Sequence, residues 1–333
     1  MATSSLRPFN SFGVNAQCDH LIKIYSEQDI YDALLTYGTP YKVIGGGSNI
    51  LLAGDIKATV LINQIKGIEV VDEDENCVLV TVGGGENWHN LVLWSISHNL
   101  SGLQNLSLIP GSVGAAPIQN IGAYGVEQST CFHSLRAVSL NTGLTKVYYK
   151  EDCKFGYRDS IFKKEDAGKY IITHVTYMLS KTVDVNVSYG AIRTELDKRS
   201  IEQPTLAELS NVICDIRKSK LPDPLVVGNA GSFFKNPIVS EKIYESLLDK
   251  YPDIVAYPFG DAMKLSAGWL IDRAGWKGRS QNGAAVYKNH ALVLVNDGTD
   301  SGGDIWHLAM DIQADVQAKY GVEIVPEVNV WGK

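Results

Sequence analysis

The sequence lacks the long apolar run that a membrane-spanning helix requires, and we expect no leader of an exported protein. No segment approaches about 18 consecutive apolar residues, and the stretch MATSSLRPFNSFGVNA has one arginine and no apolar core. The five cysteines are an odd number, widely spaced and without a C-x-x-C pair, so neither a disulfide framework nor a zinc site is predicted; they are Cys18, Cys77, Cys131, Cys153 and Cys214. We expect a soluble, unexported protein of the reducing cytoplasm.

Basic residues are also fewer than acidic ones. The 333 residues include 30 basic and 37 acidic side chains, a net charge of −7, so an extended surface for nucleic acid or for an anionic membrane is not expected. The seven histidines show neither H-x-x-x-H nor H-E-x-x-H spacing, so no metal site is predicted. What is present is ordinary for a globular protein, with 45% apolar and 20% charged residues and no internal repeat. The expected partner is a small molecule.

Apolar periodicity and capping signals predict helices and strands in an irregular order. Ser26 and Asp29 form a capping-box pattern before one helix, and Thr205 and Glu208 form another before the helix 205–220, which the prolines of LPDP end at a domain boundary. Further helices are expected at 87–100, 241–250, 266–274 and 304–320, and strands at 41–44, 58–62, 68–71, 77–82, 136–140, 144–149, 169–180, 291–296 and 322–331. The strands on either side of 141–143 are expected to form a hairpin. Because this order is not the regular βαβα repeat of a doubly wound sheet, we predict an α+β architecture.

A glycine run follows the predicted strand 41–44 and consists of Gly45, Gly46, Gly47, Ser48 and Asn49. Glycines without a Cβ let successive backbone N–H groups approach a pyrophosphate closely. The run is not a Rossmann fingerprint, because Ile50 stands where the third glycine is required. It is therefore a candidate phosphate cradle, with a plain tight turn as the alternative.

The segment 109–125 is built almost wholly of small residues and is predicted to be a long loop. Its apolar side chains favour a covered position, so it can lie flat against a large planar ligand, with a compact surface loop as the alternative. Two separate glycine-rich loops together favour a dinucleotide. The candidate cofactor residues here are Ile109, Pro110, Gly111, Ser112, Gly114, Ala115, Gln119, Asn120, Gly122, Ala123, Tyr124 and Gly125.

Three further side chains stand in settings that favour chemistry. Arg158 lies among aromatic residues in KFGYRDSIF, where a guanidinium can clamp a carboxylate or simply pair on the surface. Ser232 lies between glycine and phenylalanine and can be a nucleophile, a proton donor or a turn residue, although no G-x-S-x-G pattern surrounds it. Glu327 is predicted inside the final strand, where a buried carboxylate requires a partner, as in a structural ion pair.

Seven segments, in chain order, carry a resemblance to a known family: YKVIGGGSNILL, LIPGSVGAAPIQNIGAYG, CKFGYRDSIFK, RKSKLPDP, GNAGSFFKNP, SAGWLIDRAGWKG and PEVNVWG. From about residue 10 to the C-terminus the chain resembles the UDP-N-acetylenolpyruvoylglucosamine reductases of the longer, type I branch. The resemblance implies noncovalent FAD in a two-part domain of the vanillyl-alcohol-oxidase (PCMH) type, a C-terminal α+β substrate-binding domain and NADPH as electron donor. The implied bounds are 1–65 with 321–333 and 66–217 for the two FAD-binding subdomains, and 218–320 for the substrate domain.

The resemblance also assigns residues. The two glycine-rich segments match the family's FAD-binding segments, and Tyr189 matches a tyrosine that closes over substrate in the type I branch. Arg217, Lys220 and Asn236 fall on segments that line the uridine diphosphate end of the substrate. Asn329 departs from the family, in which an arginine is expected at this position, so a cationic contact from residue 329 is not expected.

The implied reaction is the reduction of UDP-N-acetylenolpyruvoylglucosamine to UDP-N-acetylmuramate, in the synthesis of peptidoglycan for the cell wall. Arg158, Ser232 and Glu327 match the family's three catalytic positions. Hydride transfer from N5 of FAD to C3 of the enolpyruvyl group pushes negative charge towards C2 and the carboxylate. Arg158 and a protonated Glu327 can stabilise that charge, and Ser232 can protonate C2.

Two other functions stay open. An FAD-dependent oxidase of the same superfamily would pass its electrons to oxygen, and a nucleotide-binding regulator without turnover would bind a uridine nucleotide and consume no NADPH. In each case the partner is a small molecule, neither nucleic acid nor a membrane is involved, and we expect a monomer.

Overall fold

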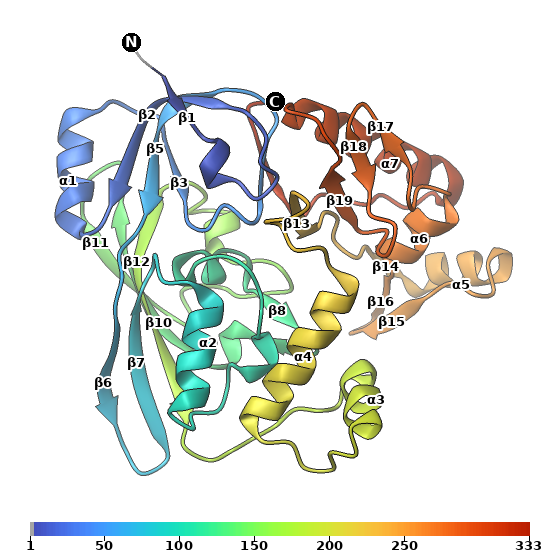
Figure 1. The fold of residues 1–333 in the computed structure, drawn as a ribbon, viewed down its shortest axis with the longest axis horizontal. Coiled ribbons are helices and arrows are strands. Elements are labelled where there is room, and N and C mark those ends of the chain that lie inside the picture. The colour runs from blue at the N-terminus through green and yellow to red at the C-terminus, as the bar shows by residue number, and fades with distance from the viewer. Residues whose placement is uncertain (1–2) are drawn as a thin grey trace. The chain divides into compact units, whose positions relative to one another are not determined.

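The computed structural model describes residues 3–333, and the chain divides into two compact units that are each assembled from separate segments (Figure 1). Unit 1 contains Cys18–Gly47 and Lys57–Ser219 with the residues up to Ser4. Unit 2 contains Ser5–Gln17, Ser48–Ile56 and Lys220–Lys333. The chain thus passes between the units several times, for the last time at 219–220. The threefold domain division with the bounds given above stays a prediction.

A small four-stranded sheet with the order β1-β2-β5-β3 belongs mainly to unit 1. Its strands are β1 (Ser4–Ser5), β2 (Gln17–Ile24), β5 (Ile56–Asn63) and β3 (Tyr41–Ile44). Helix α1 (Glu27–Thr36) starts at Ser26, whose hydroxyl accepts the Asp29 N–H at 3.3 Å while the Asp29 carboxylate accepts the Ser26 N–H at 2.9 Å. The predicted capping box is confirmed. Strand β2 was not predicted, because polar residues interrupt its apolar alternation.

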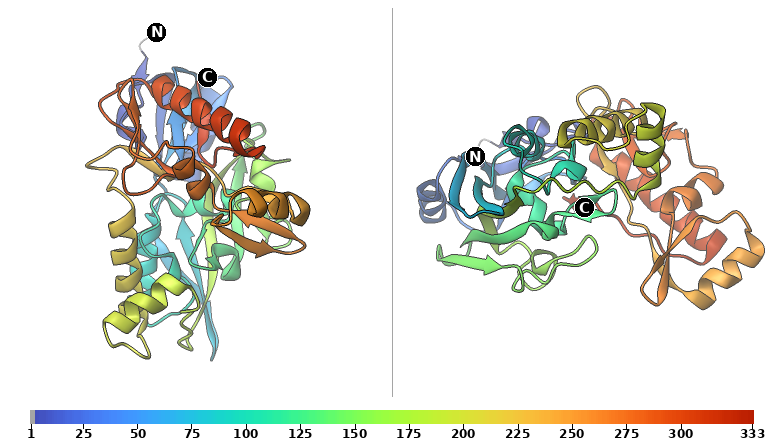
Figure 2. Two further views of the ribbon diagram at one scale, coloured as in Figure 1. Left: turned by 90° about the vertical axis from the view of Figure 1, so that its right-hand side faces the viewer. Right: turned by 90° about the horizontal axis from the view of Figure 1, so that it is seen from below.

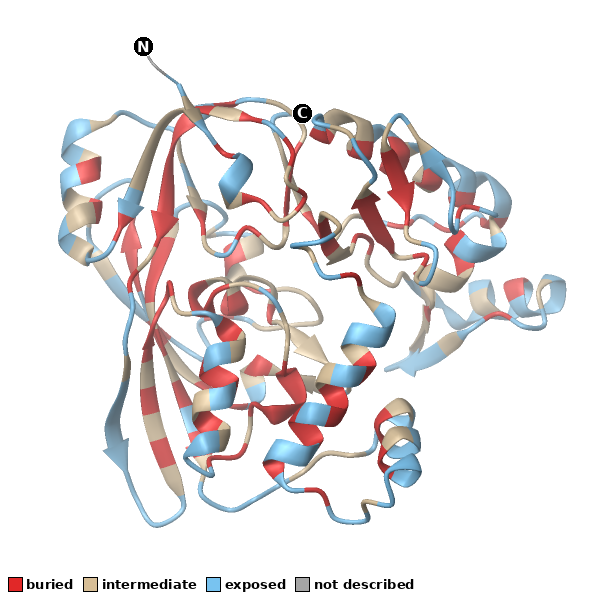
Figure 3. Ribbon diagram, viewed as in Figure 1, coloured by how far each residue is buried: buried red, intermediate tan, exposed pale blue. Residues whose placement is uncertain are grey.

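An antiparallel sheet with the order β11-β10-β12-β7-β6 forms the larger part of unit 1. Its strands are β6 (Ile68–Glu73), β7 (Cys77–Gly83), β10 (Phe132–Ser139), β11 (Thr145–Tyr149) and β12 (Tyr170–Ser180). Helix α2 (Trp88–Ser97) buries Trp88 and Leu91 in the same apolar cluster as Val80 and Val82 of β7. The sheet is least covered at its edge strand β6, which is mostly exposed in Figure 3. The predicted hairpin of β10 and β11 is confirmed.

The segment between α2 and β10 is more regular than the predicted long loop. It contains the 3₁₀ helices η2 (Gln104–Leu106), η3 (Val113–Gln119) and η4 (Gln128–Thr130), and a two-stranded hairpin of β8 (Gly122–Ala123) and β9 (Val126–Glu127). The prediction of an open loop at 109–125 was therefore wrong in part. Its small residues allow backbone segments to pack closely, and that packing lets short 3₁₀ turns form.

Two helices complete unit 1. Helix α4 (Leu206–Lys220) has the predicted capping box, in which Thr205 Oγ1 accepts the Glu208 N–H at 3.2 Å and Glu208 accepts the Thr205 N–H at 2.9 Å. Its apolar stripe packs against α3 (Gly190–Lys198), which was not predicted, in a cluster that also includes part of Tyr124. Figure 1 shows the two helices in yellow and olive.

Unit 2 combines short sheets with three helices. One sheet has the order β13-β19-β18-β17 and a second has the order β14-β16-β15. Helix α7 (Gly302–Tyr320), the long red helix of Figure 2, packs against β18, β19 and β4. The other elements are β4 (Ile50–Leu52), β13 (Asn229–Ser232), β14 (Ile238–Ser240), α5 (Glu241–Lys250), β15 (Ala256–Phe259), β16 (Ala262–Leu265), α6 (Ala267–Arg273), β17 (Ser280–Gln281), β18 (Ala284–Val286) and β19 (Val293–Asn296). The predicted α+β class is confirmed.

The final strand is much shorter than predicted. Only β20 (Asn329–Trp331) is a regular strand, and it pairs in parallel with β4. Upstream of it, Pro326 makes a single isolated bridge to Phe234. The prediction of a strand over 322–331 was wrong because proline has no N–H to continue a ladder. Within residues 3–333, no helix has the length and apolar character needed to span a membrane.

Candidate active site

The glycine run of unit 1 packs directly against the segment 109–125. A Cβ placed on Gly45 would collide with Ser112 Oγ, and one placed on Gly46 would lie 2.8 Å from the Gly111 Cα. Gly47 has a φ of +64°, which favours glycine. The two predicted cofactor segments therefore pack against each other, through the Ser112 side chain at Gly45 and through the Gly111 backbone at Gly46. A side chain at position 46 would require that backbone to move.

A third glycine run, Gly83–Gly85, joins this arrangement and was missed in the sequence. A Cβ on Gly85 would lie 2.6 Å from the Gln64 backbone, and Gly114 N–H donates to the Gly84 carbonyl at 2.8 Å. The run follows the apolar strand β7 in the segment TVGGGENW, so its signal was as visible as that of the first run. Three glycine-rich segments thus form one closely packed backbone layer in unit 1.

Ser112 supplies an independent sign that this layer receives a ligand. Its hydroxyl is buried and has no hydrogen-bond partner among residues 3–333. An unsatisfied buried hydroxyl costs about 1 to 3 kcal/mol, and an oxygen of a bound ligand can remove that cost. The glycine cradle and this hydroxyl fit the pyrophosphate of a dinucleotide such as FAD, with Gly45, Gly46, Gly47 and Ser112 as the residues that would hold it.

Three hydrogen bonds attach the turn that carries Arg158 to the segment 109–125. Arg158 Nη2 donates to the Gly122 carbonyl at 2.7 Å, Ser160 Oγ donates to Ile118 O at 2.7 Å, and Asn120 Nδ2 donates to Gly156 O at 3.2 Å. The turn is closed by reciprocal backbone bonds between Gly156 and Asp159, and Arg158 at its tip has a φ of +53°. A bulky residue in this conformation is strained, so the surrounding contacts must hold it.

A second cluster in unit 1 brings together Tyr124, Tyr189 and Arg217. Tyr124 stands at the tip of the β8–β9 hairpin with a φ of +52°, and its ring meets that of Tyr189 edge to face at 5.2 Å between centroids. Arg217 hydrogen-bonds to the Tyr124 side chain, and burial lowers the pKa of Arg217. The charge of Arg158 lowers this pKa further. The two positively charged guanidinium groups repel each other, and an anionic ligand that binds between them would relieve this repulsion.

Not every predicted cofactor residue points its polar groups at a ligand. Asn120 is fully buried, its amide N–H groups donate to Glu127 at 2.6 Å and to Gly156, and its oxygen accepts from Gln128 and Ser129. The side chain of Asn120 therefore shapes the segment from within. Gln119, the last residue of η3, is only partly buried, and Pro110 is exposed.

In unit 2 backbone pairing places Ser232 and Glu327 on neighbouring segments. Ser232 ends β13 opposite Val293, directly after Gly231 with its φ of +69°. Glu327 N–H donates to the Phe233 carbonyl at 2.7 Å, one residue from Ser232. Glu327 lies outside the final strand and is only half-buried, so the expectation of a carboxylate buried within a strand was wrong.

Asn49 belongs to unit 2, where hydrogen bonds join it to Asn329 and Glu327. The backbone N–H and the side-chain Nδ2 of Asn329 each donate to the Asn49 carbonyl at 3.1 Å, and Asn49 Nδ2 donates to the Glu327 carbonyl at 3.5 Å. Asn329 therefore joins β20 to residue 49. Ser48 precedes Asn49 in the same turn.

The remaining predicted residues of unit 2 differ in how they are held. Asn236 Oδ1 accepts the Ala267 N–H at 3.0 Å, at the first residue of α6. Lys220 is exposed at the end of α4. Of the three predicted catalytic residues, Arg158 belongs to unit 1, and Ser232 and Glu327 belong to unit 2.

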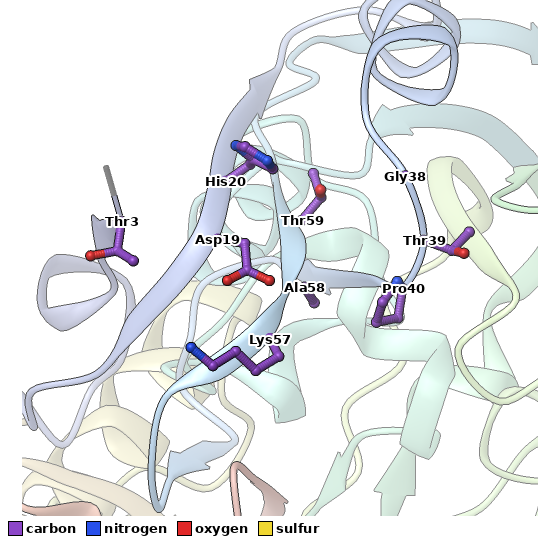
Figure 4. A pocket seen from close by; sticks show the side chains of 9 residues that line it. All are labelled: Thr3, Asp19, His20, Gly38, Thr39, Pro40, Lys57, Ala58 and Thr59. Atoms are coloured by element: carbon purple, nitrogen blue, oxygen red, sulfur yellow. The ribbon is translucent and has the colours of Figure 1, made fainter. Parts of the chain in front are cut away.

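A surface cavity of about 490 Å³ in unit 1 involves none of these residues (Figure 4). It lies at β2 and β5 and at the chain just before β3. Its lining mixes one acidic and two basic or titratable side chains with small residues: Thr3, Asp19, His20, Gly38, Thr39, Pro40, Lys57, Ala58 and Thr59. Over residues 3–333, no group of three or more His, Cys, Asp or Glu side chains is arranged to hold a metal ion.

Comparison with known proteins places both glycine-rich loops in one recognised domain. The model of an FAD binding domain matches residues 24–147. The model of the C-terminal domain of UDP-N-acetylenolpyruvoylglucosamine reductase matches residues 223–331, the range that contains Ser232, Asn236 and Glu327. The prediction of FAD as the cofactor is thereby confirmed.

Related proteins and a related structure extend over nearly the whole chain. The chain is 46% identical to the UDP-N-acetylenolpyruvoylglucosamine reductase of Pseudomonas syringae pv. tomato, over 98% of this chain and 97% of that protein. It is 47% identical to the reductase of the same description from Burkholderia cenocepacia, over 97% of this chain and 94% of the other. The crystal structure of the reductase from Thermus caldophilus has the same fold, with a TM-score of 0.68 at 24% identity over 99% of each chain. The protein whose sequence and site are described above belongs to the UDP-N-acetylenolpyruvoylglucosamine reductase family.

Proposed function

We propose that this protein catalyses the FAD-dependent reduction of UDP-N-acetylenolpyruvoylglucosamine to UDP-N-acetylmuramate, a step in peptidoglycan precursor synthesis, with NADPH as the electron donor. The observation that carries the proposal is the attachment of the Arg158 turn to the FAD-binding segment by three hydrogen bonds. It supports a guanidinium held beside the cofactor, where a substrate carboxylate needs a cation. The chain matches reductases of this description over nearly its whole length, and this match supports the choice of substrate.

Arg158 binds the carboxylate of the enolpyruvyl group by charge-assisted hydrogen bonds. FAD, when bound and reduced by NADPH, would supply the hydride that reduces the vinyl ether. As the substrate gains negative charge at C2 and the carboxylate, Arg158 stabilises it, and a preorganised donor of this kind contributes about 3 kcal/mol. The bond from Arg158 to the Gly122 carbonyl orients the guanidinium before the substrate arrives.

Ser232 delivers the proton to C2, and Glu327 assists in its protonated form, in which its O–H donates a hydrogen bond to the developing negative charge. A serine hydroxyl can act as an acid here because the carbanionic centre is far more basic than water at neutral pH. The bond from Glu327 N–H to Phe233 O keeps the backbone of Glu327 close to that of Ser232. The proton on the serine is then replaced from a neighbouring group or from water.

The uridine diphosphate end is bound by Arg217, Tyr189, Lys220 and Asn236. Arg217 and Tyr124 hydrogen-bond to each other, and Tyr189 closes over the substrate from its edge-to-face contact with Tyr124. The proposal includes a monomeric protein that works in the cytoplasm, where both UDP-sugars and NADPH are available.

Anaerobic mixing tests the proposal. The flavin absorbance of the purified holoenzyme should disappear on addition of NADPH and return on addition of UDP-N-acetylenolpyruvoylglucosamine. Reoxidation by air in preference to the sugar nucleotide would favour an oxidase. A colourless protein that binds a uridine nucleotide without consuming NADPH would favour a regulator.

A further inference from the structure

A half-buried histidine, His89, contacts through its ring the residue that precedes the proposed FAD-binding segment, 109–125. His89 is the second residue of α2, and its Nδ1 accepts the Leu108 N–H at 3.0 Å. The residue before it, Trp88, donates its N–H to the Gly111 carbonyl at 3.0 Å. The first turn of α2 therefore holds the chain at two points, 108 and 111, where the segment 109–125 begins.

Leu108 connects this helix to the cluster of Tyr124, Tyr189 and Arg217, which we propose binds the substrate. Its carbonyl accepts a hydrogen bond from Arg217 Nε at 3.2 Å, so its N–H binds His89 and its C=O binds Arg217. Leu108 has a φ of +58°, a conformation that a branched side chain avoids. Such a residue keeps its conformation only when its neighbours hold it, and these two hydrogen bonds are the ones that do so at its backbone.

The orientation of Arg217 depends on that carbonyl. A guanidinium is a rigid, planar fork, so fixing Nε on one acceptor fixes the direction of its other donors. Arg217 also hydrogen-bonds to Tyr124 from the neighbouring hairpin. If Leu108 turned, both the plane of the guanidinium and its contact with Tyr124 would change.

We propose that His89 is a positioning residue for the nucleotide-binding Arg217, and that it acts through the Leu108 backbone without touching the substrate. The proposal rests on the proposed function, since it takes Arg217 to bind the diphosphate. The required property of His89 is an acceptor at the position of Nδ1. Any side chain that supplies one there should serve, and any that does not should misorient Arg217.

The test compares three substitutions at residue 89 and one at a matched histidine. His89→Asn keeps an acceptor at the same distance from the backbone as Nδ1, His89→Leu removes it at similar size, and His89→Gln carries its polar group one carbon further out. His98, exposed at the other end of α2 with its Nδ1 on the Trp94 carbonyl at 2.8 Å, supplies the control His98→Leu.

The measurement is the dissociation constant of UDP for each FAD-loaded protein, with flavin content and Tm as parallel readouts. We expect His89→Leu and His89→Gln to weaken UDP binding by roughly 5- to 30-fold, as for loss of one arm of a hydrogen-bond network. His89→Asn should stay within about twofold of the unmodified protein, as should His98→Leu, with flavin content unchanged throughout. Equal losses in His89→Asn and His89→Leu, or no loss in either, would overturn the proposal.

A double-mutant cycle separates positioning from general stability. If His89 acts through Arg217, then His89→Leu should have almost no further effect on UDP binding in an Arg217→Ala background. Additive losses would show that His89 acts by another route. Failure of the unmodified holoenzyme to bind UDP at all would instead contradict the proposed function, which distinguishes the two.

Discussion

The two units hold their candidate site residues by different physical means. In unit 1, the candidate residues Tyr124 and Arg158 have left-handed backbone, with φ values of +52° and +53°, and so does Leu108 beside them, with +58°. Side-chain hydrogen bonds from His89, Asn120 and others keep them in place. In unit 2, Ser232 and Glu327 are placed by backbone pairing to Val293 and Phe233.

The difference predicts how each unit responds to substitution. Main-chain groups make the hydrogen bonds of a backbone ladder, so a small substitution at Ser232 or Glu327 should remove a chemical group and leave its surroundings in place. A strained turn held by side chains is displaced when one of those side chains changes. We therefore expect chemistry to be lost selectively in unit 2, and binding to be lost through indirect changes in unit 1.

The largest expected effect is that of Ser232→Ala. Because β13 positions the backbone, the variant should lack only the proton donor. Reoxidation of the flavin by substrate should slow by about 10² to 10⁴-fold, the range for a general acid, while reduction by NADPH stays near its normal rate. Rapid mixing under anaerobic conditions measures both half-reactions.

Ser232→Cys is the control, because a thiol also carries a transferable proton and should recover part of the activity. Equal slowing of both half-reactions, with FAD and substrate still bound, would mean that Ser232 shapes the site and does not deliver the proton. The expectation that a substitution in unit 2 removes only a chemical group would then be wrong.

The next effect concerns the glycine layer of unit 1. Gly46→Ala places a Cβ 2.8 Å from the Gly111 Cα, so the FAD-binding segment must shift, and we expect FAD affinity to fall by about tenfold or more. Gly38→Ala is the matched control, since a Cβ at Gly38 meets nothing within 4 Å. Flavin content after gel filtration, with Tm to verify folding, gives the comparison. Normal flavin content in a folded Gly46→Ala protein would contradict the cradle.

A smaller effect is expected for Tyr189→Phe. The ring keeps its edge-to-face contact with Tyr124, so only the hydroxyl is lost. The KM for the sugar nucleotide should rise by roughly three- to tenfold, with flavin content unchanged. Tyr25→Phe, at a tyrosine of unit 1 that is 62% exposed, is the control. Unchanged kinetic constants for Tyr189→Phe would make it a structural residue.

The smallest effect concerns pH. Burial and the nearby charges of Lys218 and Arg217 lower the pKa of His89 from 6.5. Burial and two nearby lysines lower the pKa of His290, and burial lowers that of His174. The folded state disfavours the protonated forms of these histidines. Their contribution to folding stability is therefore complete above 6.5, their pKa in the unfolded chain, and is lost as the pH falls below that value. Tm should therefore decrease as the pH falls below 6.5. Carboxylates with a lowered pKa, such as Glu27, lose their stabilising contribution only at lower pH, below 4.5.

Thermal unfolding of His89→Asn and His174→Asn checks this window. Two of the three histidines belong to unit 1 and one to unit 2. The slope of Tm against pH below 6.5 should be shallower in each variant than in the unmodified protein. An unchanged slope would show that these histidines do not set the acid stability.

Much of the local structure was predictable, because its signals lie within a few residues of each other. The capping boxes at Ser26 and Thr205 and the hairpin at 141–143 were identified from neighbouring residues alone. The missed elements lacked such signals. Polar residues interrupt the apolar alternation of strand β2, and α3 has no capping side chain at its start, Tyr189.

The candidate site was predictable in composition but not in arrangement. The sequence motifs identified FAD, and the family model confirms it over 24–147. The individual catalytic and substrate-binding assignments stay predictions. Gly83–Gly85 was overlooked, and the role of His89 had no sequence signal, since a lone histidine on a helix gives no indication of what its ring contacts.

The caps, the turns and the glycine runs follow from the amino-acid sequence alone, because each depends on the conformational preferences of adjacent residues. Three other features arise from packing between distant segments: Gly45 and Gly46 lie against Ser112 and Gly111, Leu108 bridges His89 and Arg217, and the final strand is limited to Asn329–Trp331. Such contacts join residues far apart in the chain. They form when the packing of the whole unit offsets the entropy of closing the intervening loops, and no local pattern records that balance.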